Sequence, residues 1–442
     1  MPKYFIQFAQ SHEEFRLPEL ESLAKIENVK IVYDKEEYKK DHVVQCPFLT
    51  LEIETEEEAV RLVRRAILIR KIYELWAVEK TYEEIHSHVK AKPERWPQYD
   101  YMSFKFSVSA FGSTCSLDYQ VRIINSFSYL GFKGDIDLKN PQVQFAVLED
   151  YGMDLSSGNR DLVNKFNLKK RNYIGNTSMD AELSLIMANQ ALASSGKLIY
   201  DPFVGTGSFL FTCSHFGAYT IGSDIDGRQI RGQGNESIKS NIKQYQLQDR
   251  VLDNLVFDIV HHPWREGTLF DAIITDPPYG VRAGAKTLGR KDPTKKPIKT
   301  HLIDGIPAHK HQDYYPPTKP YEMSQLLIDL LEFSAKYLVV GGRLVYWLPN
   351  VVDEYSSTDI PTHPCIELIS NSEQRFGQWS RRLITMEKVK EYIIDHQTHV
   401  NVKEHSEDSL LFLQKDKDDV TDCKQTEEKK PSHYLFREKV RK

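Results

Sequence analysis

Hydrophobic positions in the first 80 residues of the chain repeat with two different periods. Alternating apolar residues predict strands at 4–9, 31–33, 48–54 and 71–78, and a helical period predicts helices at 17–27 and 56–70. Acidic residues open the second of these helices and basic residues close it, which suits the helix dipole. The resulting β-α-β-β-α-β order predicts a ferredoxin-like domain over residues 1–80.

The pattern changes twice further along the chain. Residues 81–155 predict a smaller α+β domain, with strands at 102–110, 135–138 and 142–148 and a helix at 117–130. Residues 156–175 are a basic linker. Residues 176–400 alternate strands and helices, which is typical of a Rossmann-like, doubly wound α/β domain. Residues 401–442 form a charged tail.

A glycine-rich turn follows the first strand of the α/β domain. Asp201 ends the apolar run 197–200, and Phe203, Gly205 and Gly207 precede the next helix. Glycines at such a turn let the backbone approach a nucleotide-like ligand. A dinucleotide-binding turn would carry a third glycine where this chain has Leu210. Asp201 would repel a pyrophosphate but attract an α-amino group, so the pattern favours S-adenosylmethionine over NAD, with a ligand-free turn as the alternative.

Two further acidic residues follow the next strands. Asp224 ends the strand 218–224, where a carboxylate can hold both ribose hydroxyls, and Asp226 is the alternative to it. Asp258 ends the strand 251–258 and is either an acceptor for the adenine amino group or an ordinary surface acid.

The strand 269–275 delivers Asp276-Pro277-Pro278-Tyr279 to the edge of the sheet where ligands bind. An exocyclic amine of a nucleobase is a poor nucleophile because its lone pair is delocalised into the ring. Asp276 and the main-chain carbonyl of Pro277 can accept its N–H groups, and the two prolines stiffen that carbonyl. Tyr279 offers a flat face to an extruded base. These residues predict methyl transfer to an amine.

These motifs resemble those of the tRNA guanosine N2-methyltransferases that carry a THUMP domain, most closely the eukaryotic catalytic subunits that act at position ten of tRNA. Residues 201–207 and 276–280 match the methyltransferase motifs, and residues 134–141 resemble the closing strand of a THUMP domain. Residues 171–180 resemble the segment that lies beside the cofactor in this family, which implies that Thr177 and Ser178 contact it. The resemblance covers most of the chain and implies a class I methyltransferase domain behind the two N-terminal α+β domains.

The resemblance implies tRNA as the substrate, although the net charge of the chain is −5. RNA binding therefore needs local basic groups. The linker supplies such a cluster, which we expect to contact phosphate: Arg160, Lys165, Lys169, Lys170 and Arg171. The basic segment 281–320 could act as a lid over the RNA. The alternatives are a methyltransferase for guanine N2 of ribosomal RNA or for adenine N6, and a catalytically silent RNA-binding subunit.

The remaining composition limits the cofactors, partners and location. Five dispersed cysteines without a Cys-x-x-Cys spacing predict reduced thiols, a cytoplasmic protein and no zinc site in this chain. His309 and His311, like the other histidine pairs, have no second set of ligands, so we expect no metal. No apolar run reaches membrane-spanning length. The family resemblance alone implies a partner, a small zinc-binding activator protein that forms a heterodimer with the catalytic subunit.

Overall fold

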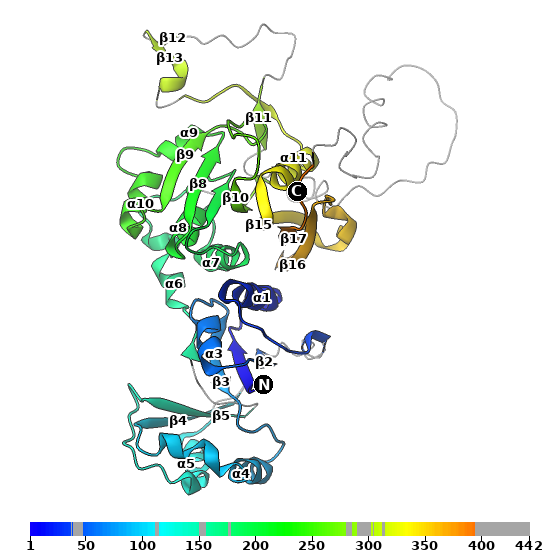
Figure 1. Ribbon diagram of the computed structural model, residues 1–442. Coiled ribbons are helices and arrows are strands. Elements are labelled where there is room, and N and C mark those ends of the chain that lie inside the picture. Colours follow the sequence, from blue (N-terminus) through cyan, green and yellow to red (C-terminus); the bar gives the residue numbers. More distant parts are fainter. Residues whose placement is uncertain are drawn as a thin grey trace, which may run out of the picture. The chain divides into compact units, whose positions relative to one another are not determined.

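The computed structural model describes residues 1–36, 38, 47–110, 115–149, 156–175, 178–279, 285–289, 302–303, 305–311 and 314–393. The chain divides into two compact units, Met1–Leu162 and Val163–Lys442 (Figure 1). The predicted tail lies outside the described residues, as do residues 281–284, 290–301, 304, 312 and 313 of the segment proposed as a lid. No described helix is long and apolar enough to cross a membrane.

A four-stranded sheet organises the start of the N-terminal unit. Its strands, in the order β2-β1-β3-β6, are Phe48–Glu52, Lys3–Phe8, Ile69–Glu74 and Ser156–Ser157. The apolar side chains of α1 (Arg16–Glu27) and α3 (Glu56–Val63) share a buried core with the first three strands. The fourth strand therefore comes from a part of the chain that follows the second predicted domain. The strand predicted at 31–33 is wrong, because only Val32 bridges to Glu52.

Helix α3 ends earlier than the sequence predicts. Thr55 accepts the backbone N–H of Glu58 and starts the helix. After Val63 the chain turns inward, and the buried Glu19 carboxylate accepts the N–H groups of Ile67 and Leu68 at 3.0 and 2.8 Å. A buried carboxylate satisfied by two backbone donors fixes this turn and directs the chain into β3.

The second part of the N-terminal unit contains α4 (Tyr82–Lys90), α5 (Leu117–Ser126) and two parallel strands, β4 (Phe104–Ala110) and β5 (Val143–Glu149). The strand predicted at 135–138 is reduced to one bridge between Ile136 and Phe104.

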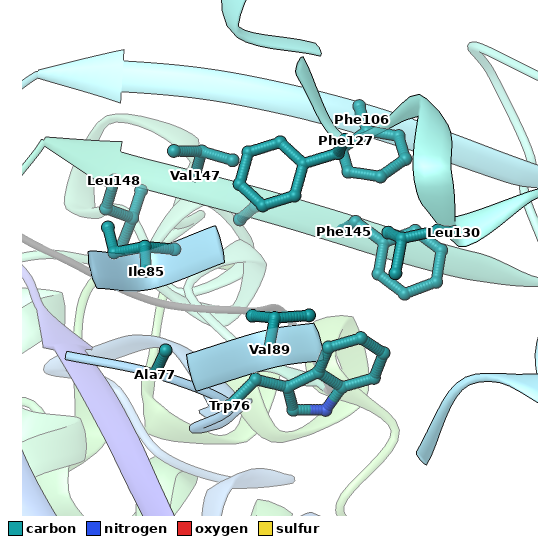
Figure 2. A pocket seen from close by; sticks show the side chains of 11 residues that line it. Trp76, Ala77, Ile85, Val89, Phe106, Phe127, Leu130, Phe145, Val147 and Leu148 are labelled. Carbon is teal, nitrogen blue, oxygen red and sulfur yellow. The ribbon is translucent and has the colours of Figure 1, made fainter. Parts of the chain in front are cut away.

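Aromatic rings fill the core between these elements. The ring of Phe145 stacks on that of Phe132 with centroids 4.7 Å apart and on that of Phe106 at 5.0 Å. Figure 2 shows a small apolar cavity in this core, lined by side chains that include Trp76, Val89 and Phe127. Its lining offers no group for acid–base chemistry, so we assign it to packing.

The C-terminal unit is built on a seven-stranded sheet in the order β16-β17-β15-β10-β7-β8-β9. The strands in that order are Ile366–Phe376, Trp379–Lys388, Leu338–Val351, Phe270–Thr275, Leu198–Asp201, Tyr219–Asp224 and Val251–Val256. The last five are mutually parallel, and β17 runs antiparallel to both of its neighbours. The order along the parallel part reverses at β7 and β10, where ligands bind in open α/β sheets.

The helices of this unit are α6 (Asp161–Lys165), which begins before the division, α7 (Ala181–Gln190), α8 (Ser208–His215), α9 (Gly227–Arg231), α10 (Ile238–Tyr245) and α11 (Met323–Tyr337). Helix α11 packs Leu326, Leu327 and Leu330 into a core shared with Tyr200 and Phe270. Short antiparallel pairs join β11 (Lys286–Leu288) to β14 (Thr318–Pro320) and β12 (Leu302–Ile303) to β13 (Ile306–Pro307).

Candidate active site

The glycine-rich turn links β7 to α8 at the carboxyl end of the sheet. Gly205 and Gly207 have φ angles of +50° and +85°, a region that favours glycine. A Cβ on Gly222 in the neighbouring strand would lie 2.5 Å from Cγ2 of Val204. Strand β8 therefore packs closely against the turn, which leads directly into α8.

Asp201 lies under this turn and is almost completely buried. Its Oδ1 accepts a hydrogen bond from Oγ1 of Thr275 at 2.8 Å and one from the N–H of Phe203 at 3.0 Å. Its Oδ2 has no hydrogen-bond partner among the described residues. Burial raises the pKa of Asp201 to about 8. A buried carboxylate with one oxygen free is suited to a cationic group of a ligand.

Asp224, at the end of β8, holds the turn as well as facing it. Its Oδ2 accepts the N–H of Gly205 at 2.9 Å and its Oδ1 that of Asp226 at 2.8 Å. Burial raises the pKa of Asp224 to about 6. The carboxylate of Asp226 is instead paired with the exposed side chain of Arg228. Of the two acids considered for a ribose, Asp224 is the one bonded to the glycine-rich turn.

Asp258 holds a neighbouring segment of the chain in place. It accepts hydrogen bonds from Oγ1 of Thr287 at 2.7 Å, from the N–H of Leu288 at 2.6 Å, and from both the N–H and the ring of His261. Burial alone would raise the pKa of Asp258, but these hydrogen bonds hold it below its usual value. Asp258 therefore ties β11 to the end of the sheet, a role that the sequence pattern does not indicate.

The segment before α7 closes over the glycine-rich turn. Oγ of Ser178 lies 2.7 Å from Oγ1 of Thr206, and a Cβ on Gly175 would lie 2.8 Å from Cγ2 of that threonine. The side chain of Asn241 bonds both the N–H and the C=O of Tyr173. Ser178 is therefore placed beside the turn, whereas Thr177 lies outside the described residues.

Asp276 follows β10 and meets two neighbours that differ in charge. The Tyr279 hydroxyl donates a hydrogen bond to its Oδ1, and Nη1 of Arg381 lies 4.0 Å from its Oδ2. Burial raises the pKa of Asp276 to about 6, against the opposing effects of Arg381 and Tyr279. Pro277, which lies between Asp276 and Tyr279 in the sequence, is buried. The carboxylate is therefore available to accept an N–H, provided that Tyr279 moves its hydroxyl.

Arg381, on β17, is a site residue that the sequence pattern does not single out. Its guanidinium lies 4.1 Å from the ring centroid of Trp347, its Nε donates to Oε1 of Gln374 at 2.9 Å, and its Nη2 lies 3.9 Å from Sδ of Met179. The β15–β17 pairing brings it to Asp276 from a distant part of the chain.

The basic linker is not uniformly exposed. Lys165, Lys169 and Lys170 are exposed, whereas Arg160 is half-buried and donates to the C=O of Ile67 at 2.8 Å. Arg171 is 6% exposed, and its Nη1 donates to Oγ of Ser208 at 2.8 Å. The guanidinium of Arg171 therefore braces the start of α8, which corrects its expected place in an exposed cluster.

No described group of three or more His, Cys, Asp or Glu side chains has the arrangement of a metal site.

Comparison with known proteins relates this site to two families. Residues 2–171 match the Tmrp11 THUMP N-terminal domain, and residues 169–291 match the RMKL-like methyltransferase domain. The chain is 39% identical to the tRNA (guanine(10)-N(2))-methyltransferase of Schizosaccharomyces pombe, over 99% of this chain and 96% of that protein. It is 39% identical to the human protein of that name, over 88% and 89%, and 40% identical to that of Saccharomyces cerevisiae, over 87% and 92%.

Proposed function

Because the chain belongs to the tRNA (guanine(10)-N(2))-methyltransferase family, we propose that its site transfers a methyl group to N2 of guanosine 10 in tRNA. It is an S-adenosylmethionine-dependent enzyme with a THUMP domain before its methyltransferase domain. The observation that carries the chemistry is the carboxylate of Asp276 at the carboxyl end of β10, next to the turn that begins at Asp201.

The residues divide into a cofactor side and a base side. When bound, S-adenosylmethionine supplies an electrophilic methyl group. We propose that the free oxygen of Asp201 binds the amino group of the cofactor and that Asp224 binds its ribose. The backbone at Phe203, Gly205 and Gly207 lets the cofactor lie close to the turn. We also assign Ser178 to this side. The family resemblance adds Thr177, which lies outside the described residues, and Asp258 acts through β11.

On the base side, Asp276 accepts an N–H of the guanine amine and orients its lone pair towards the methyl group. The amine gains a bond to carbon and must then lose a proton, which the Asp276 carboxylate is placed to accept. The Pro277 carbonyl is the second acceptor, and Tyr279 stacks on the base once its hydroxyl leaves Asp276. We propose no metal in this reaction.

The test is direct. The chain, purified together with the activator protein proposed below, is incubated with S-adenosylmethionine and unmodified tRNA, and the nucleosides are analysed by mass spectrometry. N2-methylguanosine should form with wild-type tRNA and be absent when guanosine 10 is replaced by adenosine. Formation of N6-methyladenosine, or methylation of ribosomal RNA instead of tRNA, would support the alternative substrates, and failure to bind S-adenosylmethionine would indicate a silent RNA-binding subunit.

We further infer a division of labour along the chain. The domains at 1–80 and 81–155 capture tRNA, the linker 156–175 contacts phosphate through its exposed lysines, and 176–400 carries out the chemistry, with 401–442 as a tail. A cytoplasmic location suits the dispersed thiols, of which the described Cys115, Cys213 and Cys365 form no disulfide.

We also propose that the chain works as the catalytic subunit of a heterodimer with a small zinc-binding activator protein. Strand β9 is an edge of the catalytic sheet, and its Leu252 and Val256 side chains are 56% and 46% exposed. An apolar sheet edge suits pairing with a strand of another protein. Leu252→Lys should abolish co-purification of the activator and the activity gained from it, while full activity of the purified chain alone would contradict the proposal.

A further inference from the structure

The hairpin of β16 and β17 extends the sheet beyond the catalytic strand. Thr275, the last residue of β10, pairs with Tyr346, whereas β15 continues to pair with β17 as far as Val351. Five more residues of β15 correspond to roughly 16 Å of strand. Because β10 and β15 are parallel, this extension rises past the carboxyl edge at which Asp276 lies.

The tip of the hairpin is a short and defined turn. Phe376 pairs with Trp379 across Gly377 and Gln378, and Gly377 has a φ of +78°. A glycine with positive φ at the first position of a two-residue loop is typical of a type II′ turn, which matches the twist of the strands. The two aromatic side chains are therefore presented by rigid backbone.

These side chains form an aromatic pair in which Phe376 is exposed and Trp379 is half-buried. The rings of Phe376 and Trp379 are stacked with centroids 4.4 Å apart and an interplanar angle of 21°, and Phe376 is 42% exposed. Arg381 stands two residues after Trp379, so the two share a face of β17. The Arg381 guanidinium lies 5.7 Å from the Phe376 ring centroid and 4.0 Å from Asp276, which makes the pair continuous with the reaction centre.

The charge of the hairpin suits a polyanion. Residues 373–382 carry Arg375, Arg381 and Arg382 against the single acid Glu373. The side chain of Arg375 is 65% exposed, although it also pairs with Glu373 at 3.1 Å. Exposed aromatic rings interleaved with arginines are the combination that binds unstacked nucleotides.

We propose that the Phe376–Trp379 pair is a stacking platform for a tRNA base next to the target guanosine. The inference rests on the function proposed above. Extrusion of a base for chemistry leaves the faces of its neighbours exposed, and an aromatic pair beside the reaction centre can cover one of them. The target base itself belongs to Asp276 and Tyr279, so the platform contributes affinity for tRNA rather than chemistry.

The experiment compares full-length variants in filter-binding titrations with tRNA at several salt concentrations. Phe376→Ala should weaken tRNA binding by roughly ten- to hundred-fold, the size of one lost base–aromatic stack. The slope of affinity against salt should stay the same, because stacking releases no counterions. Phe376→Trp should restore binding, and calorimetry should show unchanged affinity for S-adenosylmethionine.

Tyr219→Ala is the matched control. Tyr219 is 38% exposed and also has an arginine, Arg250, 5.0 Å from its ring centroid, but it begins β8 and so lies at the opposite edge of the sheet. Its removal should leave tRNA affinity unchanged. Equal losses in the two variants would overturn the platform, as would wild-type affinity in Phe376→Ala.

Two further readouts separate other causes. Thermal unfolding shows whether Phe376→Ala merely melts the hairpin. If it does, ultraviolet crosslinking of the wild-type chain to tRNA decides the matter: a crosslinked peptide containing Phe376 or Trp379 supports the platform, and crosslinks confined to other peptides contradict it. Failure of the proposed function would appear separately, as the absence of N2-methylguanosine with the wild-type chain.

Discussion

At the scale of single residues, the reaction depends on a carboxylate that already has neighbours. One oxygen of Asp276 receives the Tyr279 hydroxyl, and the other faces Arg381. For Tyr279 to stack on the base its hydroxyl must leave Asp276, and Arg381 favours the charged carboxylate while it does so. The roles of Asp276 and of Arg381 can be tested separately.

Asp276→Ala should reduce methyl transfer by at least roughly a hundred-fold, because a group positioned for the transition state is lost. Its affinity for S-adenosylmethionine should remain nearly unchanged, since the cofactor side is built on Asp201 and Asp224. Single-turnover kinetics and calorimetric titration measure the two effects. A large loss of cofactor affinity would move Asp276 into the cofactor site.

Arg381→Gln should change the pH dependence of catalysis. The reaction needs ionised Asp276, whose pKa is about 6 in the folded chain, so the rate should fall as pH drops through that value. Burial raises this pKa, whereas Arg381 and the hydrogen bond from Tyr279 lower it. Loss of the cation should therefore shift the acidic limb of kcat/KM to higher pH.

Two variants accompany that measurement. Arg381→Lys keeps the charge and should return the limb towards the wild-type position. Arg382→Gln is the control, for which no shift of the limb is expected. It removes the next arginine of the same strand, which is similarly buried but lies 3.7 Å from the ring centroid of Tyr355. A uniform loss of rate at every pH in Arg381→Gln, without a shifted limb, would leave Arg381 with a packing role only.

The sequence predicts site residues that stand inside motifs and misses those brought in by pairing. Asp201 and Asp224 end their strands and Asp276 directly follows one, so one sequence is enough to identify all three. Arg381 reaches Asp276 only through the β15–β17 register, which no local pattern contains. Arg171 shows the reverse: a run of basic residues says nothing about which side chain turns inward, and Arg171 lies on Phe211.

At the scale of elements, the strands with strong apolar patterns are the ones that sequence predicts well. The four parallel strands β7, β8, β9 and β10 appear where the sequence pattern predicts them, with ends shifted by at most two residues. Strand β6 is two serines, which carry no apolar signal and pair with β3 only because the chain returns to the first sheet. The short run 31–33 has the composition of a strand but bridges at Val32 alone.

Asp258→Ala should loosen β11. The substitution strands the donors of Thr287, Leu288 and His261, a change that costs about 1–3 kcal/mol for buried groups. Faster cleavage between residues 285 and 320 in limited proteolysis is therefore expected, with a smaller effect on affinity for S-adenosylmethionine. The exposed Asp253 of β9 provides the control, as Asp253→Ala. Unchanged cleavage together with a large loss of cofactor affinity would return Asp258 to the adenine site.

At the scale of the whole molecule, the chain separates into two units with their own cores, and the boundary lies within the basic linker. The backbone at Gly158 and Asn159 bonds to Arg70 and Ala66, so the linker's first residues belong to the N-terminal unit. The sequence predicts the linker but not that its first residues bind to the N-terminal unit. A catalytic fragment should therefore begin at Val163.

The fragment from Val163 should bind S-adenosylmethionine like the full chain, because Asp201, Asp224 and the glycine-rich turn all lie within it. It should lose most affinity for tRNA, because recognition of RNA shape, ends and phosphates is assigned to the N-terminal unit. In the full chain, charge reversal of the exposed Lys169 and Lys170 should weaken tRNA binding and flatten its salt dependence, since fewer counterions are released. Filter binding at two salt concentrations measures both effects, and a fragment that bound tRNA as tightly as the full chain would leave the N-terminal unit without this role.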